Sequence, residues 1–540
     1  MKKTAINLSI LILFVIQFCL AQSTSITPGG LELNNKGNSD VLTIPKLSNQ
    51  AISAIQAPKI GSLVYDIDSN CIRVYNGNIW VCLTDSGSIP FHLPQKLTTK
   101  IIGSSQTGPQ TAGSIVINAV SVDNAGNFYL AGRIFGCYSS PISVCSNYSS
   151  DLFRLPTGIV LKFSSSGAFK WATTVTGLPV TGQYPDSGFS SEVSDITIKN
   201  DKIYLIGNYS KSISWQNKII TSNGEKDIFI AKIDTSKTVN WIKNIGGISD
   251  EISSSIFIDE NSNIIITGAY KSSPLIINQG NNSISLSNSG GYDTFISKFD
   301  VNGNLLGATK VGGTNDDLPE SLTYQSPYFY IAGTYINNFT ASTYSFTSTG
   351  GKDTFILKFN SLLSIAGANR FFGLSANDEV TPREIKFINN KLYLCGYFNG
   401  SINFGNKSLT SSIPSSFLSS FYFYESPYVD YLQTITNGGS FISVIPNNSL
   451  IYAIGNYATG ATTMNIPLQS QGSSDVFLFE LKKSGNFESN NFEFSRYTTA
   501  GTESSEAAYK VLSYNGKIYI FGGGTSFYNN RAQYLYMWSY

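Results

Sequence analysis

Five acidic residues recur at a nearly constant spacing before a repeated glycine. Each precedes the glycine of a Tyr-x-x-Gly type pattern, as Glu251 precedes Gly268. The five are Glu192, Glu251, Asp317, Glu379 and Glu506. Carboxylate oxygens bind cations and polar ligands, so one interpretation is a binding rim at one mouth of a central channel. The alternative is that each carboxylate accepts backbone N–H groups between repeats. The absence of the acid from the first and sixth repeats favours this alternative.

Other kinds of chemistry have little support in the sequence. The chain has a single histidine, which disfavours His-rich zinc sites and Ser/Cys–His catalysis. It contains no Walker A loop, G-x-S-x-G elbow, C-x-x-C or G-x-G-x-x-G motif. Lys and Arg total 36 against 35 Asp and Glu, so no electrostatic footprint for nucleic acid is present. We therefore predict no catalytic residue, no metal site and no cofactor.

Four cysteines are candidates for disulfide bonds. Cys71 and Cys82 flank two strand-like runs joined by Asn76-Gly77, a strong hairpin signal, so the two thiols either pair across the strands or stay free. Cys137 and Cys145 bracket a Ser/Pro-rich loop that a disulfide would close, with the same alternative. Cys395 lies in a strand pattern and is interpreted as a buried thiol.

The glycine pattern is an internal repeat. It occurs seven times, at intervals of roughly 60–75 residues. The repeated glycines are Gly132, Gly207, Gly268, Gly333, Gly396, Gly455 and Gly522. A tyrosine precedes the glycine by three residues in every repeat except the one with Ile265. We interpret these tyrosines as core residues between repeats.

Each repeat contains four strand-like runs that are joined by Asp-, Asn- and Gly-containing turns. The second and third runs are apolar on both faces, which is typical of a sheet covered on both sides. Four antiparallel strands repeated radially are the blade of a β-propeller. Residues 91–540 then form seven blades of about 64 residues each. The last repeat lacks its fourth strand, and residues 97–104 match that strand, so we predict that the N-terminal strand closes the ring.

These repeats resemble the bacterial seven-bladed β-propeller repeat family (SBBP repeats). The core motif of that family, Asp-x-x-Gly-Asn-x-Tyr-x-x-Gly, is intact at residues 123–132 and looser in later repeats. Its second motif, Gly-x-Asp-x-Phe, is represented by an aspartate two residues before a phenylalanine. The aspartates are Asp227, Asp293, Asp353 and Asp475. We expect them to fix a turn by Asx-type bonding. The resemblance implies a fold and specifies no activity.

The N-terminus is different in kind. Lys2 and Lys3 precede a short apolar run that ends near Ala21, so residues 1–21 are interpreted as a signal peptide. Acylation at Cys19 is disfavoured by the bulky Phe18 before it. Residues 22–90 resemble a short segment found near the N-terminus of secreted and cell-surface bacterial proteins. They are expected to form a small β-hairpin module with a flexible start. No transmembrane segment is predicted, and the expected location is periplasmic, secreted or at the cell surface.

Function is expected at long connections on one face of the propeller. The connections between second and third strands are rich in Ser, Asn and Gly, and some have the pattern of short hairpins. They span residues 211–226, 271–292, 336–352, 399–416 and 458–474. The leading hypothesis is a non-catalytic, monomeric propeller that binds an extracellular protein or glycan there. The alternatives are an extracellular propeller enzyme of the lyase or glycosidase type, and a structural or adhesive surface component.

Overall fold

The computed structural model shows a chain of two compact units, Met1–Gln95 and Lys96–Tyr540, and each is described by itself. The residues described are 32–35, 40–56, 58–59, 62–69, 71–75, 80–83, 97–104, 114–138, 142, 144–145, 156–178, 190–279, 282–349, 351–447, 450–458, 460–463, 466–467, 473–483, 492–500, 505–525 and 533–540. The predicted signal peptide, residues 1–21, lies outside them.

The N-terminal unit is a small sheet with one short helix. Its strands, in sheet order, are β3 (Lys46–Leu47), β4 (Leu63–Asp66), β5 (Cys71–Tyr75) and β6 (Trp80–Leu83). The predicted pairing of β5 with β6 is observed. Helix α2 (Asn49–Ser53) is capped by the Ser48 hydroxyl, and β1 (Glu32–Asn35) pairs with β2 (Asp40–Thr43). Within the described part of the chain, no helix is long and apolar enough to cross a membrane.

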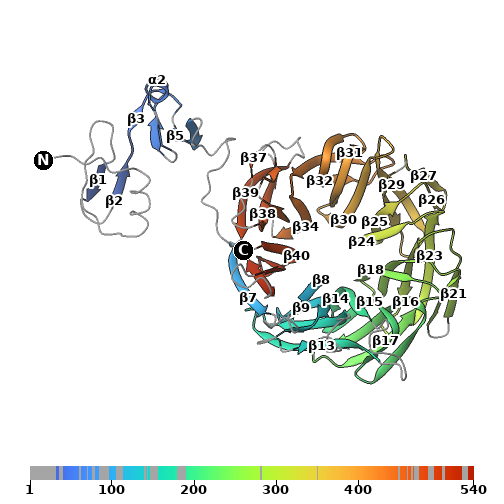
Figure 1. The fold of residues 1–540 in the computed structure, drawn as a ribbon. Helices are drawn as coiled ribbons and strands as arrows, with labels where there is room; N and C mark the ends of the chain where they lie inside the picture. Colours follow the sequence, from blue (N-terminus) through green and yellow to red (C-terminus); the bar gives the residue numbers. More distant parts are fainter. Residues whose placement is uncertain are drawn as a thin grey trace. The chain divides into compact units, whose positions relative to one another are not determined.

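The second unit is built from four-stranded antiparallel meanders that stand around a central axis (Figure 1). The order of strands in each meander runs from the axis outward. The first ones are β8 (Ser114–Val122), β9 (Phe128–Phe135), β12 (Thr157–Phe163), β13 (Phe169–Gly177); β14 (Ser191–Lys199), β15 (Lys202–Trp215), β16 (Lys218–Asp234), β17 (Val239–Ile245); and β18 (Glu251–Ile258), β19 (Ile264–Tyr270), β22 (Asp293–Phe299), β23 (Leu305–Gly313).

The remaining meanders follow the same order of pairing. They are β24 (Leu318–Gln325), β25 (Tyr328–Tyr335), β28 (Asp353–Phe359), β29 (Ile365–Gly373); β30 (Glu379–Ile388), β31 (Lys391–Asn403), β32 (Ser408–Tyr422), β33 (Tyr428–Thr436); β34 (Ser440–Asn447), β35 (Leu450–Ala458), β38 (Ser474–Lys483), β39 (Phe492–Ala500); and β40 (Ser505–Tyr514), β41 (Lys517–Thr525), β42 (Gln533–Ser539), β7 (Thr98–Ser104).

The inner strands form a closed ring. Each inner strand contacts the inner strand of the next meander along the chain, and β40 contacts β8 (Figure 1). The core lies between neighbouring meanders, where the repeated tyrosines are buried as predicted; Tyr129 and Tyr393 are examples. Radially arranged antiparallel sheets with both faces covered are the architecture of a β-propeller.

The N-terminal strand completes the last meander, as the sequence predicted. Strand β7 pairs antiparallel with β42, with Thr99 opposite Trp538 and Lys100 opposite Met537. The aromatic side chain of Trp538 is 1% exposed in this arrangement. Strand β42 therefore does not end in an open sheet edge, which would attract pairing with other chains.

The number of strands exceeds four per meander because the long connections are themselves structured. They form hairpins or strand extensions, and several pair with the outer strand of the preceding meander. The added short strands are β10 (Cys137–Tyr138), β11 (Val144–Cys145), β20 (Leu275–Gln279), β21 (Asn282–Leu286), β26 (Asn338–Ala341), β27 (Tyr344–Thr347), β36 (Thr462–Thr463) and β37 (Ile466–Pro467). Figure 1 shows β26 and β27 at the outer rim. Much of the expected loop face is thus engaged in pairing at the rim.

The repeated glycine has a structural cause. Every inner strand carries a β-bulge immediately after the residue that faces this glycine. The bulge brings a main-chain carbonyl of the inner strand so close that a Cβ atom on the glycine would collide with it. In the fourth meander, for example, the Leu318 carbonyl occupies this position against Gly333. The Tyr-x-x-Gly pattern is therefore the sequence signature of a bulge that is aimed at the central axis.

Candidate functional site

The five sequence-predicted acids lie at or near the starts of inner strands, and none of them lines the central cavity described below. Glu251 and Asp317 are fully buried. The Glu251 carboxylate accepts the N–H of Gly247 at 2.8 Å, and that of Asp317 accepts the N–H of Gly313 at 2.5 Å. These contacts are those of a backbone acceptor between repeats, the alternative that the sequence favoured.

The other three acids have different surroundings. Glu192 forms an ion pair of 2.7 Å with Arg133. Glu379 is exposed, and the preceding Asp378 accepts the N–H of Ser375 at 2.8 Å instead. Glu506 is 1% exposed. Among the described residues, no three side chains of the metal-binding types are grouped so as to hold a metal ion. A binding role for the five acids stays a prediction.

The aspartates before the third strands are also buried and bonded to the main chain. Asp227 accepts the N–H of Asn223, and Asp293 accepts the N–H of Ser289, each at 2.8 Å and each from four residues earlier. This is the turn-fixing role expected from the sequence. Asp293 additionally accepts a hydrogen bond from Lys310 at 2.9 Å.

The cysteines are partly described. Cys71 is buried in β5 and is disulfide-bonded. The side chain of Cys82 lies outside the described residues, so their pairing stays a prediction; the register sets Cys82 opposite Arg73, on the same face as Cys71. Cys137 and Cys145 lie directly opposite each other across β10 and β11, although their side chains are also outside the described residues. Cys395 is a free, buried thiol, as expected.

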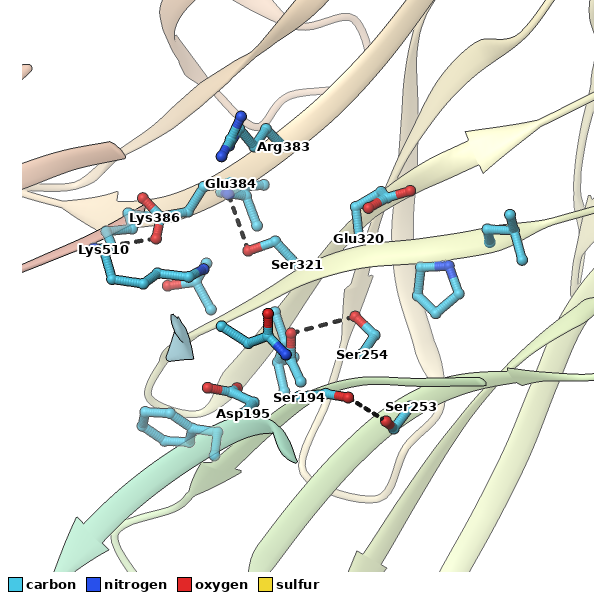
Figure 2. Close-up of a pocket in the computed structure, with 18 of the residues that line it drawn as sticks. Ser194, Asp195, Ser253, Ser254, Glu320, Ser321, Arg383, Glu384, Lys386 and Lys510 are labelled. Atoms are coloured by element: carbon cyan, nitrogen blue, oxygen red, sulfur yellow. Dashed lines mark hydrogen bonds and ion pairs between the residues drawn. The ribbon is translucent and has the colours of Figure 1, made fainter. Parts of the chain in front are cut away.

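The inner strands enclose a central cavity of about 690 Å³ (Figure 2). Its walls come from β8, β14, β18, β24, β30 and β40, with Ala269 from β19 and Pro446 from β34. Hydroxyl groups are prominent among the lining side chains; Ser194, Ser254 and Ser321 are examples. Such groups hydrogen-bond to polar ligands in both directions, because each hydroxyl is a donor and an acceptor.

The bulges decide which side chains reach this cavity. At each bulge the extra residue and the one after it interrupt the regular alternation of the inner strand. The cavity lining includes Asn118, Ser194, Asp195, Ser254, Ser255, Glu320, Ser321, Arg383, Glu384 and Lys510 from these positions. Half of these residues are small and polar and half are charged, and the charged ones do not follow the repeat. The backbone geometry thus repeats from meander to meander, whereas the charges of the side chains that face the cavity do not.

Asp195 is held by main-chain donors from two strands. One of its carboxylate oxygens accepts the N–H of Ile196, and the other accepts the N–H of Ile256 in β18, both at 2.8 Å. Desolvation nevertheless raises the pKa of Asp195 to about 6, against the opposing effect of those N–H groups and of Lys510. The carboxyl therefore changes charge just below neutral pH.

Glu320 occupies the bulge of β24 and faces the cavity. Its side chain is exposed to the cavity, yet the surrounding protein desolvates it and raises its pKa to about 7. The positive charges of Lys352 and Arg383 partly oppose this rise. Within the described structure, Glu320 makes no hydrogen bond or ion pair of its own. It is available to a ligand in either protonation state.

The remaining charged groups come from β30 and β40. Glu384 pairs with Lys386 at 3.4 Å, and Lys386 also donates to Ser443 at 3.3 Å. Arg383 donates to the hydroxyl of Tyr397 at 2.8 Å. Lys510 lines the cavity from β40, next to the bulge (Figure 2).

Sequence reasoning missed these cavity residues because it searched for residues that recur. The signal was present: Asp195, Glu384 and Lys510 each precede the glycine of their own repeat by an identical spacing. Other repeats have Ala119, Ser255, Ser321 and Ser443 at that spacing or at the neighbouring position. The informative residues were those that are charged at a position where other repeats have alanine or serine.

Comparisons with known proteins add context. A family model described as "Phage tail like trimerisation region" matches residues 24–118. A WD repeat-containing protein of Acanthamoeba polyphaga mimivirus, L264, is 24% identical over 237 residues, which are 38% of this chain and 16% of that protein. The chain thus spans only a small part of that relative's length.

Solved structures with a similar outline have little sequence in common with the chain. The polysaccharide lyase Uly1 is 10% identical, with a TM-score of 0.42, and the match covers 80% of this chain and 90% of the lyase. Semaphorin 2a of Drosophila is 6% identical, with a TM-score of 0.39, and the match covers 82% of this chain and 76% of the semaphorin.

Proposed function

We propose that this chain is an exported, seven-bladed β-propeller that binds a glycan in its central cavity. The observation that carries the proposal is the cavity itself, which is enclosed by the inner strands and lined by hydroxyl, amide and charged side chains. Sugars present many hydroxyl groups, and a site of this composition offers partners to both their donors and their acceptors. The non-repeating charges supply the asymmetry that a specific ligand requires.

We prefer the cavity to the long-connection face that the sequence suggested. Those connections form hairpins whose strands pair with neighbouring meanders, for example β26 with β23. Their large side chains are used in packing: Phe339 and Phe404 are buried. The cavity, in contrast, presents one carboxylate, Glu320, and one ammonium group, Lys510, that form no ion pair or hydrogen bond in the described structure.

Export and family membership are part of the same proposal. The charged start and apolar run before Ala21 support secretion, with a periplasmic, released or cell-surface location. The motif at residues 123–132 supports a relationship to the SBBP repeats. We propose that the propeller itself is monomeric, since its ring closes within one chain. The trimerisation-region match at residues 24–118 makes the N-terminal part the place to look for self-association. Light scattering of the full chain measures its mass directly.

The test is binding of the full-length chain to an array of immobilised saccharides, followed by calorimetry for the best one. Ser254→Trp fills the cavity and should abolish binding. Ser345→Trp places the same bulk on the exposed outer hairpin of β26 and β27 and should leave binding intact. Loss of binding in Ser345→Trp alone would place the ligand at the long connections. No binding of any saccharide by the parent chain would refute a glycan-binding function.

A second candidate is an enzyme of the lyase or glycosidase type. Its support is that Asp195 and Glu320 have pKa values of about 6 and about 7, which suit proton transfer near neutral pH. Mass spectrometry of bound saccharides after prolonged incubation distinguishes the two functions. Shortened products that disappear in Asp195→Asn or Glu320→Gln would establish catalysis, whereas recovery of the intact saccharide supports binding alone.

A further inference from the structure

The charged groups of the cavity differ in whether the protein already provides them with partners. Glu384 and Lys386 form an ion pair, and Arg383 donates to Tyr397. Lys510 is the exception among the cationic groups. In the part of the chain that the structure describes, it donates no hydrogen bond and forms no ion pair. A partly buried ammonium group without a partner is costly, so it needs a role.

The position of Lys510 is unusual within the repeat. It directly follows the bulge of β40. The corresponding residues of β8, β18, β24 and β34 are Ala119, Ser255, Ser321 and Ser443, which are short and uncharged. Six other inner strands close the ring without a lysine at this position, so the fold does not require one.

The acids near Lys510 are already engaged by other groups. Its positive charge lowers the pKa of Asp195, but each oxygen of that carboxylate accepts a main-chain N–H. Glu384 also acts on Asp195, and its Oε1 is paired with Lys386, whereas its buried Oε2 accepts no hydrogen bond in the described structure. No hydrogen bond or ion pair in the described structure joins Lys510 to any of these carboxylates, so its ammonium group is available to an anionic group of a ligand.

We propose that Lys510 binds an anionic group of the ligand, so that the cavity selects acidic saccharides over neutral ones. This inference rests on the proposed glycan binding and specifies its ligand class. A carboxylate or a sulfate group on the sugar would form a charge-assisted hydrogen bond with the ammonium group. Glu320 and the serine hydroxyls would contact the sugar's hydroxyl groups.

The experiment compares an acidic saccharide with its uncharged methyl ester. The full-length chain and its variants are titrated with tetragalacturonate and with its methyl ester, after which a sulfated tetrasaccharide separates sulfate from carboxylate recognition. We expect the parent chain to bind the acid at least tenfold more tightly than the ester. Lys510→Met should remove that preference, and Lys510→Arg should retain most of it. Lys517→Met, an exposed lysine of the same meander, is the matched control and should change nothing.

The outcomes separate the two proposals. Equal binding of acid and ester, or an acid preference that survives in Lys510→Met, overturns the inference and leaves glycan binding intact. If the chain prefers the sulfated tetrasaccharide to both tetragalacturonate and its ester, Lys510 is the anion-binding residue only if Lys510→Met abolishes that preference. Failure to bind these or any other saccharides overturns the proposed function and this inference together. Thermal melting of each variant confirms that a lost preference does not reflect unfolding.

Discussion

Two acidic residues three positions apart at the start of β24 differ in burial and in hydrogen bonding. Asp317 recurs in other repeats, is fully buried, and accepts the N–H of Gly313. Glu320 has no equivalent acid at most other bulges, faces the cavity, and has no hydrogen-bond partner in the described structure. In a repeat protein, recurrence marks what the scaffold needs in every unit. A residue that occurs in only one repeat, at a position that faces the cavity, serves a function of the whole molecule.

The recurrent acids are also paired across interfaces between meanders. Asp293 raises the pKa of Asp317, and Asp227 raises that of Glu251. All four side chains are fully buried. Both Asp293 and Asp317 have one carboxylate oxygen without a hydrogen-bond partner. The scaffold acids therefore carry an electrostatic cost that depends on pH, whereas Glu320 in the cavity is open to a ligand.

The largest expected effect is at the ring closure, where the scaffold depends on one distant strand. Deleting residues 91–104 removes β7 and exposes the backbone edge and aromatic side chains of β42, so the protein should be insoluble or melt far lower. Deleting residues 22–90 should leave the propeller folded. The check is soluble yield and thermal melting. Two truncations that both melt like the parent chain would mean that the β7–β42 pairing contributes little.

Next in size is the repeated glycine. Gly333→Ala places a methyl group against the Leu318 carbonyl and the Phe355 ring, and should cost about 3 kcal/mol. Gly307→Ala in β23 adds the same methyl group where only Leu363 is in ordinary contact, and should be nearly neutral. Chemical denaturation measures both. A neutral Gly333→Ala would contradict the bulge as the cause of the glycine pattern.

A smaller effect concerns pH and the buried acid pair. Burial and the neighbouring Asp293 raise the pKa of Asp317 to about 8, so the folded state retains a proton that the unfolded chain loses near pH 4. The contribution is therefore favourable at low pH and is lost as pH rises toward 8. Asp317→Asn supplies an N–H₂ group in place of the missing proton. It should stabilise the protein by about 2 kcal/mol at pH 9 and flatten its stability profile between pH 5 and 9.

The matched control for this substitution is Asp316→Asn. Asp316 is exposed and accepts the N–H of Tyr292, an interaction that asparagine retains. Because the charge of Asp316 is only the smallest of the causes that raise the pKa of Asp317, its stability profile should keep most of the slope of the parent chain. Urea denaturation at several pH values gives the comparison, and an unchanged slope in Asp317→Asn would show that the buried pair does not control the pH dependence.

The smallest effect on stability is expected in the cavity. Glu320 makes no contact that the fold needs, so Glu320→Gln should change the free energy of unfolding by less than about 0.5 kcal/mol near pH 4.5. Above pH 7 it should stabilise the protein, because burial raises the pKa of Glu320 to about 7. Its effect should appear in ligand binding and in the pH dependence of that binding near pH 7. A large loss of stability in Glu320→Gln would show that Glu320, like the buried acids of the scaffold, is needed by the fold.

The sequence predicted the strand order, the buried tyrosines and the pairing of β7 with β42, because each depends on local patterns that recur. It placed function at the long connections because their Ser, Asn and Gly content resembles that of loops. The structure shows hairpins there, as the pattern of some connections predicted. What the sequence did not predict is that the outer strand of the preceding meander pairs with them.

The cavity was harder to predict because its residues are defined by where the bulges point. Asp195 and Lys510 come from β14 and β40, which are far apart in the chain, and only ring closure brings them to one space. The spacing to the repeated glycine indicates which residues face the cavity, but only once the glycine is known to lie opposite a bulge.

The pairing of β7 with β42 has a consequence for how the molecule is made. Strand β7 ends at Ser104 and β42 begins only at Gln533, so β7 emerges long before its partner exists. At synthesis rates of about 5–20 residues per second, the interval is roughly 20 to 90 seconds. During that time the early meanders can form from local contacts, while the first strand has no place to dock. Strand β42 is thus the one that completes the ring, and a chain that is interrupted before Gln533 is left with β7 unpaired.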